Sequence, residues 1–321
     1  MPFRHRRMYV EDCVSMSILL NPYRDPARWL AAFQSELPDM EVELWPNVTD
    51  PTQVEFVVAS RQDPDDLRRY PNLRAVLAMG AGVEQYVGSN MPDVPVVRLA
   101  DPAMSDEMAA YVVHWVVHFQ KRMDAYLADQ ADRLWREQAY KTIDEYPVGL
   151  LGFGTIGSRI ALALADLGFP INAWTRTGTS EDWVTSYAGI DELNGFLAAS
   201  SAVVNVLPDS PTTRGLLDSG RFDHFRPPGL LINLGRGATT IESDLLDALN
   251  DGRVGAAVLD VADPEPIAAN SKLWSHPNVR ITPHIAGFTL VRSATGLIAA
   301  NISRILAGDE PFPLLDKSRG Y

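Results

Sequence analysis

Apolar runs alternate with helical patterns through the first hundred residues of the chain. Four short apolar runs are typical of buried strands, at 17–20, 54–60, 75–79 and 96–99. Apolar residues at helical spacing predict helices over 28–37 and 64–70. Because strands and helices alternate, we expect a small parallel α/β domain here.

The alternation becomes regular from residue 147 onward. Six strands are predicted, at 148–152, 170–174, 202–207, 229–234, 255–260 and 279–282. Helices are predicted at 156–167, 191–199, 214–224 and 241–251, with a last one over 289–307. Parallel strands connected by helices predict a doubly wound, Rossmann-like sheet.

A stretch between these regions, 104–138, is dense in apolar and aromatic residues. We expect it to be helical, with Tyr111, Val112, Trp115, Val116, Phe119, Met123, Tyr126 and Leu127 among its apolar positions. A helix that long cannot bury all of these side chains against one small domain, which indicates a subunit interface and a homodimer. His114 and His118 lie four residues apart, as metal ligands can, but no third ligand is evident nearby. Packing histidines are therefore favoured, and no metal site is predicted.

The most informative motif follows the strand that begins at residue 148. The apolar run enters Gly152-x-Gly154-x-x-Gly157, and a helical pattern starting at Thr155 and Ile156 comes next. The glycines allow a tight turn, a close approach of the backbone to a pyrophosphate, and close helix–strand packing. Glycines also occur in ordinary turns, but strand, motif and helix in this order favour dinucleotide binding.

The next strand suggests which dinucleotide binds. NAD sites usually carry an acidic residue about twenty residues beyond the glycine motif, and none is present here. Instead the strand ends in Thr175-Arg176-Thr177. Arg176 could bind a 2′-phosphate through charge-assisted hydrogen bonds, with help from the threonine hydroxyls. The alternative is a solvated surface arginine; we predict a preference for NADPH over NADH.

Three polar residues follow later strands, where open α/β sheets bind ligands. Arg236 lies between two glycines, Glu265 between two prolines, and His284 follows the last strand. Reduction of a keto acid needs a cation for the carboxylate, an imidazolium to supply a proton, and a carboxylate that orients the imidazole. Singly, each has a structural alternative: Arg236 could bind cofactor phosphate, Glu265 could cap a loop, and His284 could be a packing residue. Together they favour catalysis.

A second glycine loop lies in the first half of the chain. Its five residues, Met79-Gly80-Ala81-Gly82-Val83, follow a predicted strand. Such a loop can offer backbone N–H groups to an anion, or can be a plain turn into a helix. Spacing alone does not decide between the two.

Composition limits the class of protein. The chain has 321 residues, 46% hydrophobic and 21% charged, enough for two domains with their own cores. A net charge of −13 argues against nucleic-acid binding. Cys13 is the only cysteine, so an intramolecular disulfide is excluded, which suits a cytoplasmic protein. No apolar run reaches membrane-spanning length, and residues 1–15 read as a dispensable leader rather than a signal peptide.

These motifs together resemble the D-2-hydroxyacid dehydrogenase family, over nearly the whole chain. The resemblance rests on Gly152-x-Gly154-x-x-Gly157, Asn233-Leu234-Gly235-Arg236-Gly237, Leu259-Asp260-Val261 with Glu265-Pro266, and Pro283-His284. Further residues liken the chain to members that reduce glyoxylate and hydroxypyruvate: Gly80-Ala81-Gly82-Val83, Trp174-Thr175-Arg176-Thr177, Leu207-Pro208 with Thr213, Leu273-Trp274-x-His276-Pro277 and Arg319-Gly320-Tyr321.

The resemblance implies two Rossmann-like domains. The smaller, flavodoxin-like substrate domain would comprise residues 1–100 and 287–321, and the doubly wound dinucleotide-binding domain would comprise 101–286. Arg236 would bind the substrate carboxylate and keto oxygen, and His284 would donate the proton with Glu265 as its partner. Residues 79–83 would complete the carboxylate site. The implied cofactor contacts are Gly152, Gly154, Thr155, Ile156, Gly157, Thr175, Arg176, Thr177, Leu207, Pro208, Thr213, Leu234 and, for the nicotinamide carboxamide, Asp260.

The expected activity is reduction of a small 2-keto acid, glyoxylate or hydroxypyruvate, with NADPH. Trp135 is expected to reach the active site of a neighbouring subunit. Two departures, Ala262-Asp263-Pro264 and Gly287-Phe288, lie near the expected substrate site and leave the choice of keto acid open. The alternatives are a dehydrogenase for phenylpyruvate, a branched 2-keto acid or D-lactate, and a cofactor-sensing protein without catalysis.

Overall fold

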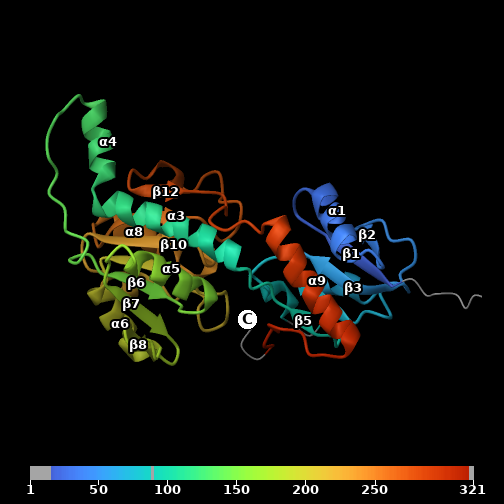
Figure 1. The fold of residues 1–321 in the computed structure, drawn as a ribbon. Coiled ribbons are helices and arrows are strands. Elements are labelled where there is room, and N and C mark those ends of the chain that lie inside the picture. The colour runs from blue at the N-terminus through green and yellow to red at the C-terminus, as the bar shows by residue number, and fades with distance from the viewer. Residues whose placement is uncertain (1–15, 88–89, 318–321) are drawn as a thin grey trace, which may run out of the picture. The chain divides into compact units, whose positions relative to one another are not determined.

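A computed structural model describes residues 16–87 and 90–317 of the chain (Figure 1). The chain forms two units: unit 1 comprises Met1–Ala100 and Thr289–Tyr321, and unit 2 comprises Asp101–Phe288. The expected leader at 1–15 and the expected motif Arg319-Gly320-Tyr321 lie outside the described residues.

Unit 1 is built on a parallel sheet of five strands in the order β2-β1-β3-β4-β5. The strands are β1 (Ser17–Asn21), β2 (Glu41–Leu44), β3 (Val54–Ala59), β4 (Ala75–Ala78) and β5 (Val96–Val97). This is the flavodoxin-like strand order, which confirms the expected fold class. β2 was not predicted because its sequence, Glu-Val-Glu-Leu, lies at the sheet edge and contributes no apolar run.

Helices cover both faces of this sheet. They are α1 (Pro26–Glu36), α2 (Pro64–Leu67), the 3-10 helix η1 (Glu84–Tyr86) and α9 (Val291–Ala307). Successive strand residues point to opposite faces, so Ile18 and Leu20 pack under α1 and α9 while Leu19 packs on the other face. The last helix therefore belongs to the core of unit 1.

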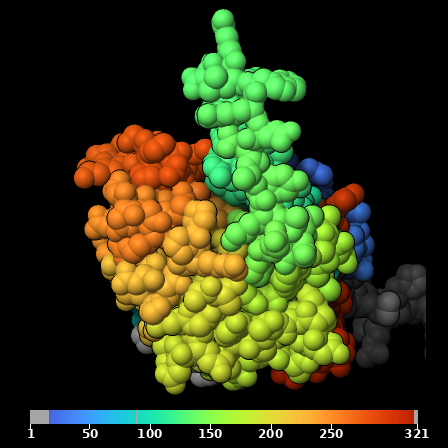
Figure 2. All heavy atoms as spheres, turned by 90° about the vertical axis from the view of Figure 1, so that its left-hand side faces the viewer, coloured from blue at the N-terminus to red at the C-terminus, as the bar shows by residue number. Residues whose placement is uncertain are grey.

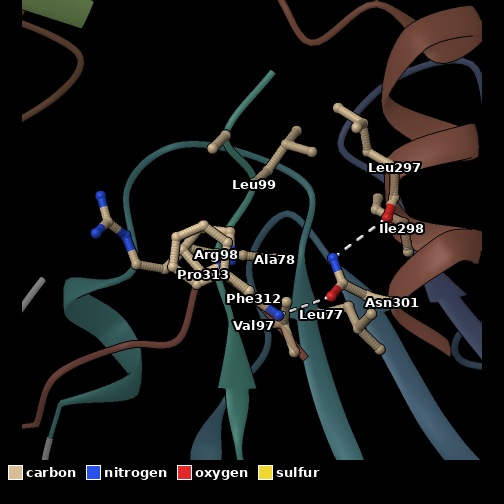
Figure 3. A pocket seen from close by; sticks show the side chains of 11 residues that line it. Leu77, Ala78, Val97, Arg98, Leu99, Leu297, Ile298, Asn301, Phe312 and Pro313 are labelled. Carbon is tan, nitrogen blue, oxygen red and sulfur yellow. Dashed lines mark hydrogen bonds between the residues drawn. The ribbon is translucent and has the colours of Figure 1, made fainter. Parts of the chain in front are cut away.

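The segment after α9 returns to the edge strand of unit 1. Leu314 bridges Val97, and the N–H of Arg98 donates to the carbonyl of Pro313 at 2.8 Å. Asn301 of α9 accepts from the N–H of Phe312 at 2.9 Å, beside a cavity of about 40 Å³ (Figure 3). This volume is closer to the volume of one water molecule than to the volume of a small-molecule ligand.

Unit 2 contains a seven-stranded parallel sheet in the order β12-β11-β10-β9-β6-β7-β8. Its strands are β6 (Val148–Leu151), β7 (Ile171–Thr175), β8 (Thr185–Ala188), β9 (Ala202–Asn205), β10 (Gly229–Asn233), β11 (Val254–Leu259) and β12 (Val279–Ile281). The doubly wound Rossmann-like sheet is confirmed. The prediction of six strands was wrong because it missed β8. This edge strand, of sequence Thr-Ser-Tyr-Ala, is largely exposed and contains no apolar run.

The strand order reverses between β6 and β9, and this reversal locates the binding crevice. In open α/β sheets, ligands bind outside the carboxyl ends of the strands at such a switch point. The connecting helices are α5 (Thr155–Ala165), α6 (Gly189–Ala199), α7 (Ser219–Phe222) and α8 (Glu242–Asn250), with two 3-10 helices, η2 (Gly237–Thr239) and η3 (Lys272–Ser275). The helix predicted over 214–224 is reduced to α7, because Gly215 adopts a left-handed conformation and Leu217 bridges Thr240.

The stretch predicted as one helix over 104–138 is two helices followed by a segment without regular structure. α3 (Pro102–Gln120) ends where Arg122 adopts a left-handed conformation with φ of 59°, and α4 (Met123–Ala131) begins at the next residue. The prediction of one helix was wrong because no glycine and no change in the apolar pattern marks the break at Arg122 in the sequence. On α3, His118 packs edge-on against Trp115 and Phe119, and burial lowers its pKa.

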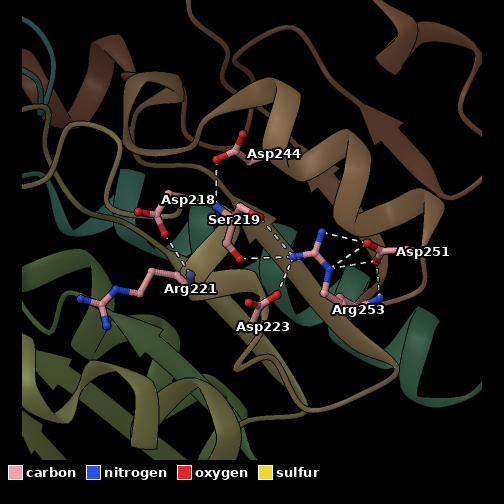
Figure 4. Close-up of polar contacts among 7 residues, drawn as sticks. All are labelled: Asp218, Ser219, Arg221, Asp223, Asp244, Asp251 and Arg253. Atoms are coloured by element: carbon pink, nitrogen blue, oxygen red, sulfur yellow. Dashed lines mark hydrogen bonds and ion pairs between the residues drawn. The ribbon is translucent and has the colours of Figure 1, made fainter.

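A polar cluster ties α7 and α8 to the start of β11 (Figure 4). Arg253 donates to Asp251 and Asp223, and the N–H of Ser219 donates to Asp244 of α8 at 2.8 Å. The hydrogen bond to Asp251, followed by that to Asp223, raises the pKa of Arg253. Arg253 directly precedes β11, so this cluster lies at the amino-terminal ends of the strands. The binding crevice is expected at their carboxyl-terminal ends. Its role is therefore structural.

Candidate active site

The glycine motif occupies the turn from β6 into α5. Gly152 has a left-handed φ of 98°, and Gly154 is the N-cap of α5. A Cβ on Gly157 would lie 2.1 Å from the carbonyl oxygen of Gly152, whereas a Cβ on Gly154 would meet nothing within 4 Å. The first N–H groups of an α-helix have no partner within the helix and attract anions. This turn therefore fits a dinucleotide pyrophosphate, with open space beside Gly154.

Two alanine substitutions separate the packing role from the binding role. Gly157→Ala should lower the melting temperature, because forcing a methyl group against fixed backbone costs about 1–3 kcal/mol. Gly154→Ala should leave the melting temperature unchanged and weaken NADPH binding about tenfold or more, because its methyl group enters the open space. Calorimetry and a fluorescence titration with NADPH measure the two effects. Equal NADPH affinity in Gly154→Ala and wild type would contradict the assignment of this turn.

The end of β7 places the residues expected to select NADPH. Thr175 is half-buried and its hydroxyl donates to the carbonyl of Gly178 at 2.9 Å. Arg176 and Thr177 are exposed. No hydrogen bond or ion pair with another described residue engages the Arg176 guanidinium. An exposed guanidinium at this strand end fits a phosphate group on the adenosine ribose.

Two buried asparagines, to which the sequence motifs assigned no role, connect the strand ends beside the glycine turn. Asn205 ends β9 and Asn233 ends β10, and both are almost completely buried. Nδ2 of Asn205 donates to Oδ1 of Asn233 at 3.0 Å and to Thr239 at 2.6 Å. The same two residues accept from the N–H groups of Leu207 and Gly235. A lone asparagine inside each apolar run, 202–207 and 230–234, was the available signal.

Arg236 lies in a turn that only glycine neighbours allow. A Cβ on Gly235 would lie 2.6 Å from the carbonyl oxygen of Leu207, and one on Gly237 would lie 2.0 Å from the carbonyl carbon of Ala262. The turn is thus pressed against the backbone that follows β9 on one side and β11 on the other. Nη1 of Arg236 donates to the carbonyl of Gly235 at 2.7 Å. Close packing of this backbone fixes the position from which the Arg236 side chain starts.

His284 and Glu265 form a direct pair. Nδ1 of His284 lies 2.9 Å from Oε2 and 3.2 Å from Oε1 of Glu265. A carboxylate only accepts hydrogen bonds, so Nδ1 carries the shared hydrogen and Nε2 is the ring atom left for a substrate. Both side chains are partly exposed, at 43% and 30%. Exposure at a strand end allows proton exchange with a small molecule.

The backbone of His284 is held in an unusual conformation by Asp260. His284 has φ of 54°, in the left-handed region that few residues other than glycine adopt. Its N–H donates to the carbonyl of Asp260 at 2.8 Å, and the Asp260 carboxylate accepts from the N–H groups of Ile285 and Ala286, both at 2.8 Å. Strained residues of this kind concentrate at functional sites.

The other residues expected near the cofactor follow the ends of β9 and β10. Leu207 and Leu234 are nearly buried, and Pro208 follows β9. Thr213 is buried as well, and its hydroxyl donates to the carbonyl of Pro208 at 2.6 Å. In this structure the Thr213 hydroxyl therefore holds the loop of Pro208.

The expected substrate loop, Met79 to Val83, lies in unit 1 after β4. Met79 and Val83 are buried, and the hydroxyl of Thr289 donates to the carbonyl of Met79 at 2.6 Å. A Cβ on Gly80 would meet nothing within 4 Å. Gly80, Ala81 and Gly82 are half-buried at the carboxyl edge of the unit 1 sheet.

The residues of unit 2 come together because of the parallel sheet. The glycine motif, Arg236, Asp260 and His284 follow β6, β10, β11 and β12, and carboxyl ends of parallel strands share one edge. Glu265 reaches this edge through the loop after β11. Among residues 16–87 and 90–317, no group of three or more His, Cys, Asp or Glu side chains is arranged to hold a metal ion. Within the same ranges, no helix has the length and apolar character needed to span a membrane.

Comparison with known proteins points to one family. The family model described as "D-isomer specific 2-hydroxyacid dehydrogenase, NAD binding domain" matches residues 113–286. Glyoxylate/hydroxypyruvate reductase A of Yersinia enterocolitica is 37% identical over 311 residues, which covers 95% of this chain and 99% of that protein. The protein of the same name from Serratia proteamaculans is 35% identical, with the same coverage.

Solved structures agree with this assignment. A D-isomer specific 2-hydroxyacid dehydrogenase from Xanthobacter autotrophicus, in complex with NADPH and MES, matches with a TM-score of 0.92 and 35% identity. An NADPH-dependent glyoxylate/hydroxypyruvate reductase from Sinorhizobium meliloti, in complex with NADP and sulfate, matches with a TM-score of 0.90 and 29% identity. Each match covers 96% of this chain and 100% of the other. The resemblance predicted from the motifs is confirmed, and the chain belongs to the D-isomer specific 2-hydroxyacid dehydrogenase family.

Proposed function

We propose that the protein reduces a small 2-keto acid, glyoxylate or hydroxypyruvate, with NADPH. The observation that carries this proposal is the hydrogen-bonded pair of His284 and Glu265 at the strand edge that also carries Arg236 and the glycine turn. Relatives named glyoxylate/hydroxypyruvate reductase A, which match almost the whole chain, support the choice of substrate.

His284 acts as the general acid in this proposal. Glu265 accepts a hydrogen bond from Nδ1, which orients the ring and leaves Nε2 as the atom that donates to the substrate. Nε2 then gives its proton to the keto oxygen as negative charge develops there. The reaction leaves a 2-hydroxy acid and a neutral imidazole, which regains a proton from water through its exposed face.

Arg236 binds and orients the keto acid. Its planar guanidinium can donate two parallel hydrogen bonds to a carboxylate. The close packing of Gly235 and Gly237 fixes the backbone from which this side chain extends, which favours one orientation of the bound carbonyl. The loop from Met79 to Val83 would offer further N–H groups to the carboxylate.

NADPH is the cofactor that the crevice fits best. The turn from Gly152 to Gly157 would hold the pyrophosphate, and Arg176, flanked by Thr175 and Thr177, would hold the 2′-phosphate. Ile156, Leu207, Pro208 and Leu234 would line the crevice, while Asp260 would face the nicotinamide carboxamide. When bound, NADPH supplies the hydride for the carbonyl carbon.

Arg176→Asp should reverse the choice of cofactor. A hydrogen bond to a charged group contributes about 1.5–3 kcal/mol, so the ratio of kcat/KM for NADPH to that for NADH should fall about 10- to 100-fold or more. Arg176→Lys is the matched control and should keep part of the preference, since it keeps the charge but not the planar fork. An unchanged ratio in Arg176→Asp would remove this residue from the cofactor site.

Product analysis tests the proposed reaction. With hydroxypyruvate and NADPH, chiral chromatography should find D-glycerate, the isomer expected of this family. Formation of L-glycerate, or of no glycerate while NADPH binds tightly, would contradict the proposal.

We also propose that the protein is a homodimer formed through the 104–138 region, and chiefly through its outer part, the arm, defined as residues 121–140. The arm projects from the rest of unit 2 (Figures 1 and 2). Its exposed apolar side chains include Met123, Leu127, Leu134, Trp135 and Tyr140. An exposed apolar surface of this kind is typical of a subunit interface.

Side-chain hydrogen bonds to Asp129 hold the end of the arm. Asp129 is only 3% exposed and accepts from Arg136 at 2.6 Å and from Gln138 at 2.7 Å. The hydrogen bond from Arg136 lowers the pKa of Asp129. These contacts close the turn that carries the fully exposed Trp135, which supports the proposal that Trp135 reaches the active site of the other subunit.

Two substitutions in the arm should give different results. Leu127→Lys should convert the dimer to a monomer in light scattering, because losing a central apolar contact costs about 2 kcal/mol or more. Trp135→Ala should remain dimeric and raise KM for the keto acid. Tyr23→Lys, an exposed aromatic in unit 1, is the control. A wild-type protein that is monomeric at micromolar concentration would refute the dimer.

A further inference from the structure

We propose that Tyr111 is a positioning residue for His284, acting through Thr282 and Asp260. Its effect on turnover rests on the proposed function, whereas its effect on the local structure can be measured separately. Tyr111 lies on α3, 173 residues before His284 in the chain. In the sequence, Tyr111 is only one of the apolar positions of the stretch 104–138.

Hydrogen-bond donors and acceptors fix the direction of this contact. The hydroxyl of Thr282 donates to Oδ1 of Asp260 at 2.6 Å, and the same hydroxyl lies 2.6 Å from the hydroxyl of Tyr111. A hydroxyl has a single hydrogen, which Thr282 gives to the carboxylate. Tyr111 must therefore donate to Thr282, and the three residues form a directed chain that ends on Asp260.

Asp260 connects this chain of hydrogen bonds to His284, the proposed proton donor. Its carbonyl accepts from the N–H of His284, and its two carboxylate oxygens accept from the N–H groups of Ile285 and Ala286. Three consecutive amides are thus held by one residue that is only 2% exposed. Hydrogen bonds in such a chain polarise and strengthen one another. Loss of the first donor therefore loosens the turn that keeps His284 in its left-handed conformation.

A second contact from the same face of α3 supports this coupling. Gly287 follows the turn of His284, and a Cβ there would lie 2.5 Å from Cγ of Met108 and 3.2 Å from Cγ of Met104. Positions 104, 108 and 111 lie on one helix face. α3 thus touches both ends of the segment from Thr282 to Gly287, by a hydrogen bond at one end and by packing at the other.

The hydroxyl of Tyr111 can donate its hydrogen bond to Thr282 over a wide pH range. The side chain is half-buried, and burial raises its pKa above the usual value near 10. The hydroxyl therefore keeps its hydrogen throughout the pH range in which a histidine acts as a general acid.

Tyr111→Phe removes the hydroxyl and leaves the ring. Loss of a neutral hydrogen bond corresponds to a change of about three- to tenfold, so kcat should fall by that factor. KM for the keto acid should change less than about twofold, since Arg236 is untouched. Amide hydrogen exchange over residues 282–287 should become faster by a similar factor, because the turn opens more easily.

Thr282 variants test whether Tyr111 acts through this residue. Thr282→Val should lower kcat about 10- to 100-fold, because it leaves a buried carboxylate oxygen without one donor. The double variant Tyr111→Phe/Thr282→Val should match Thr282→Val alone, since both changes break one chain. Thr282→Ser keeps the hydroxyl and should retain wild-type kcat and exchange.

Tyr146→Phe is the matched control. Tyr146 is a buried tyrosine of unit 2 that precedes β6, at the opposite edge of the sheet, and this variant should leave kcat and exchange over 282–287 unchanged. The proposal is overturned if Tyr111→Phe has wild-type kcat and exchange, or if its effect multiplies with that of Thr282→Val. Absence of keto-acid reduction by the wild-type protein would refute the proposed function instead, and hydrogen exchange would still decide whether Tyr111 holds the turn.

Discussion

Replacement of His284 by alanine is expected to lower kcat for keto-acid reduction about 10²- to 10⁴-fold, the usual contribution of a positioned general acid. The keto oxygen gains negative charge as the hydride arrives, and without an imidazolium only water can protonate it. NADPH binding should be unchanged, because the cofactor contacts lie in the turn after β6 and at the end of β7.

Glu265→Gln provides the matched variant for this prediction. It keeps the size of the side chain and its reach to Nδ1 of His284 but removes the negative charge. The kcat of Glu265→Gln should fall less than that of His284→Ala, because the amide oxygen still accepts from Nδ1 while the negative charge beside the imidazolium is lost. Full kcat at neutral pH in His284→Ala would refute the role of His284 as proton donor.

Replacement of Arg236 by alanine is expected to lower kcat/KM for the keto acid about 10²- to 10³-fold. Truncating one partner of a desolvated charge pair costs about 2–5 kcal/mol. Both parameters should change: KM rises because the carboxylate loses its partner, and kcat falls because the carbonyl is no longer aligned.

Arg236→Lys separates charge from geometry. Lysine keeps the positive charge but cannot donate two parallel hydrogen bonds, so it should restore KM more than kcat. NADPH affinity is the control measurement, since the alternative role of Arg236 is to bind cofactor phosphate. A kcat/KM equal to wild type in Arg236→Ala, or a loss confined to NADPH affinity, would remove Arg236 from the substrate site.

Local patterns were sufficient for most of the fold. Apolar runs predicted the buried strands of both sheets, and the parallel arrangement followed from the helices between them. Edge strands were missed because Glu41–Leu44 and Thr185–Ala188 are half-exposed and contain no apolar run. The break at Arg122 was missed because only a backbone angle marks it.

The residues proposed for catalysis could be predicted from the ends of the strands. The residues that contact and hold their backbone could not. Glycine neighbours and a final strand singled out Arg236 and His284, since these residue types are unusual at such positions. Asn205, Asn233 and Tyr111 contact residues distant in the chain, 171 positions away for Tyr111 and Thr282. No spacing in the sequence predicts such contacts. The partners of these three polar residues therefore became visible only in three dimensions.

Initial rates of NADPH oxidation with a panel of keto acids decide whether the protein is a keto-acid reductase. The panel contains glyoxylate, hydroxypyruvate, pyruvate, phenylpyruvate and a branched 2-keto acid, with NADH in parallel and NADPH binding measured by fluorescence. We expect turnover of glyoxylate and of hydroxypyruvate, at a higher kcat/KM for NADPH than for NADH. Tight NADPH binding without oxidation by any acid, or efficient turnover of phenylpyruvate or the branched acid alone, would contradict this expectation.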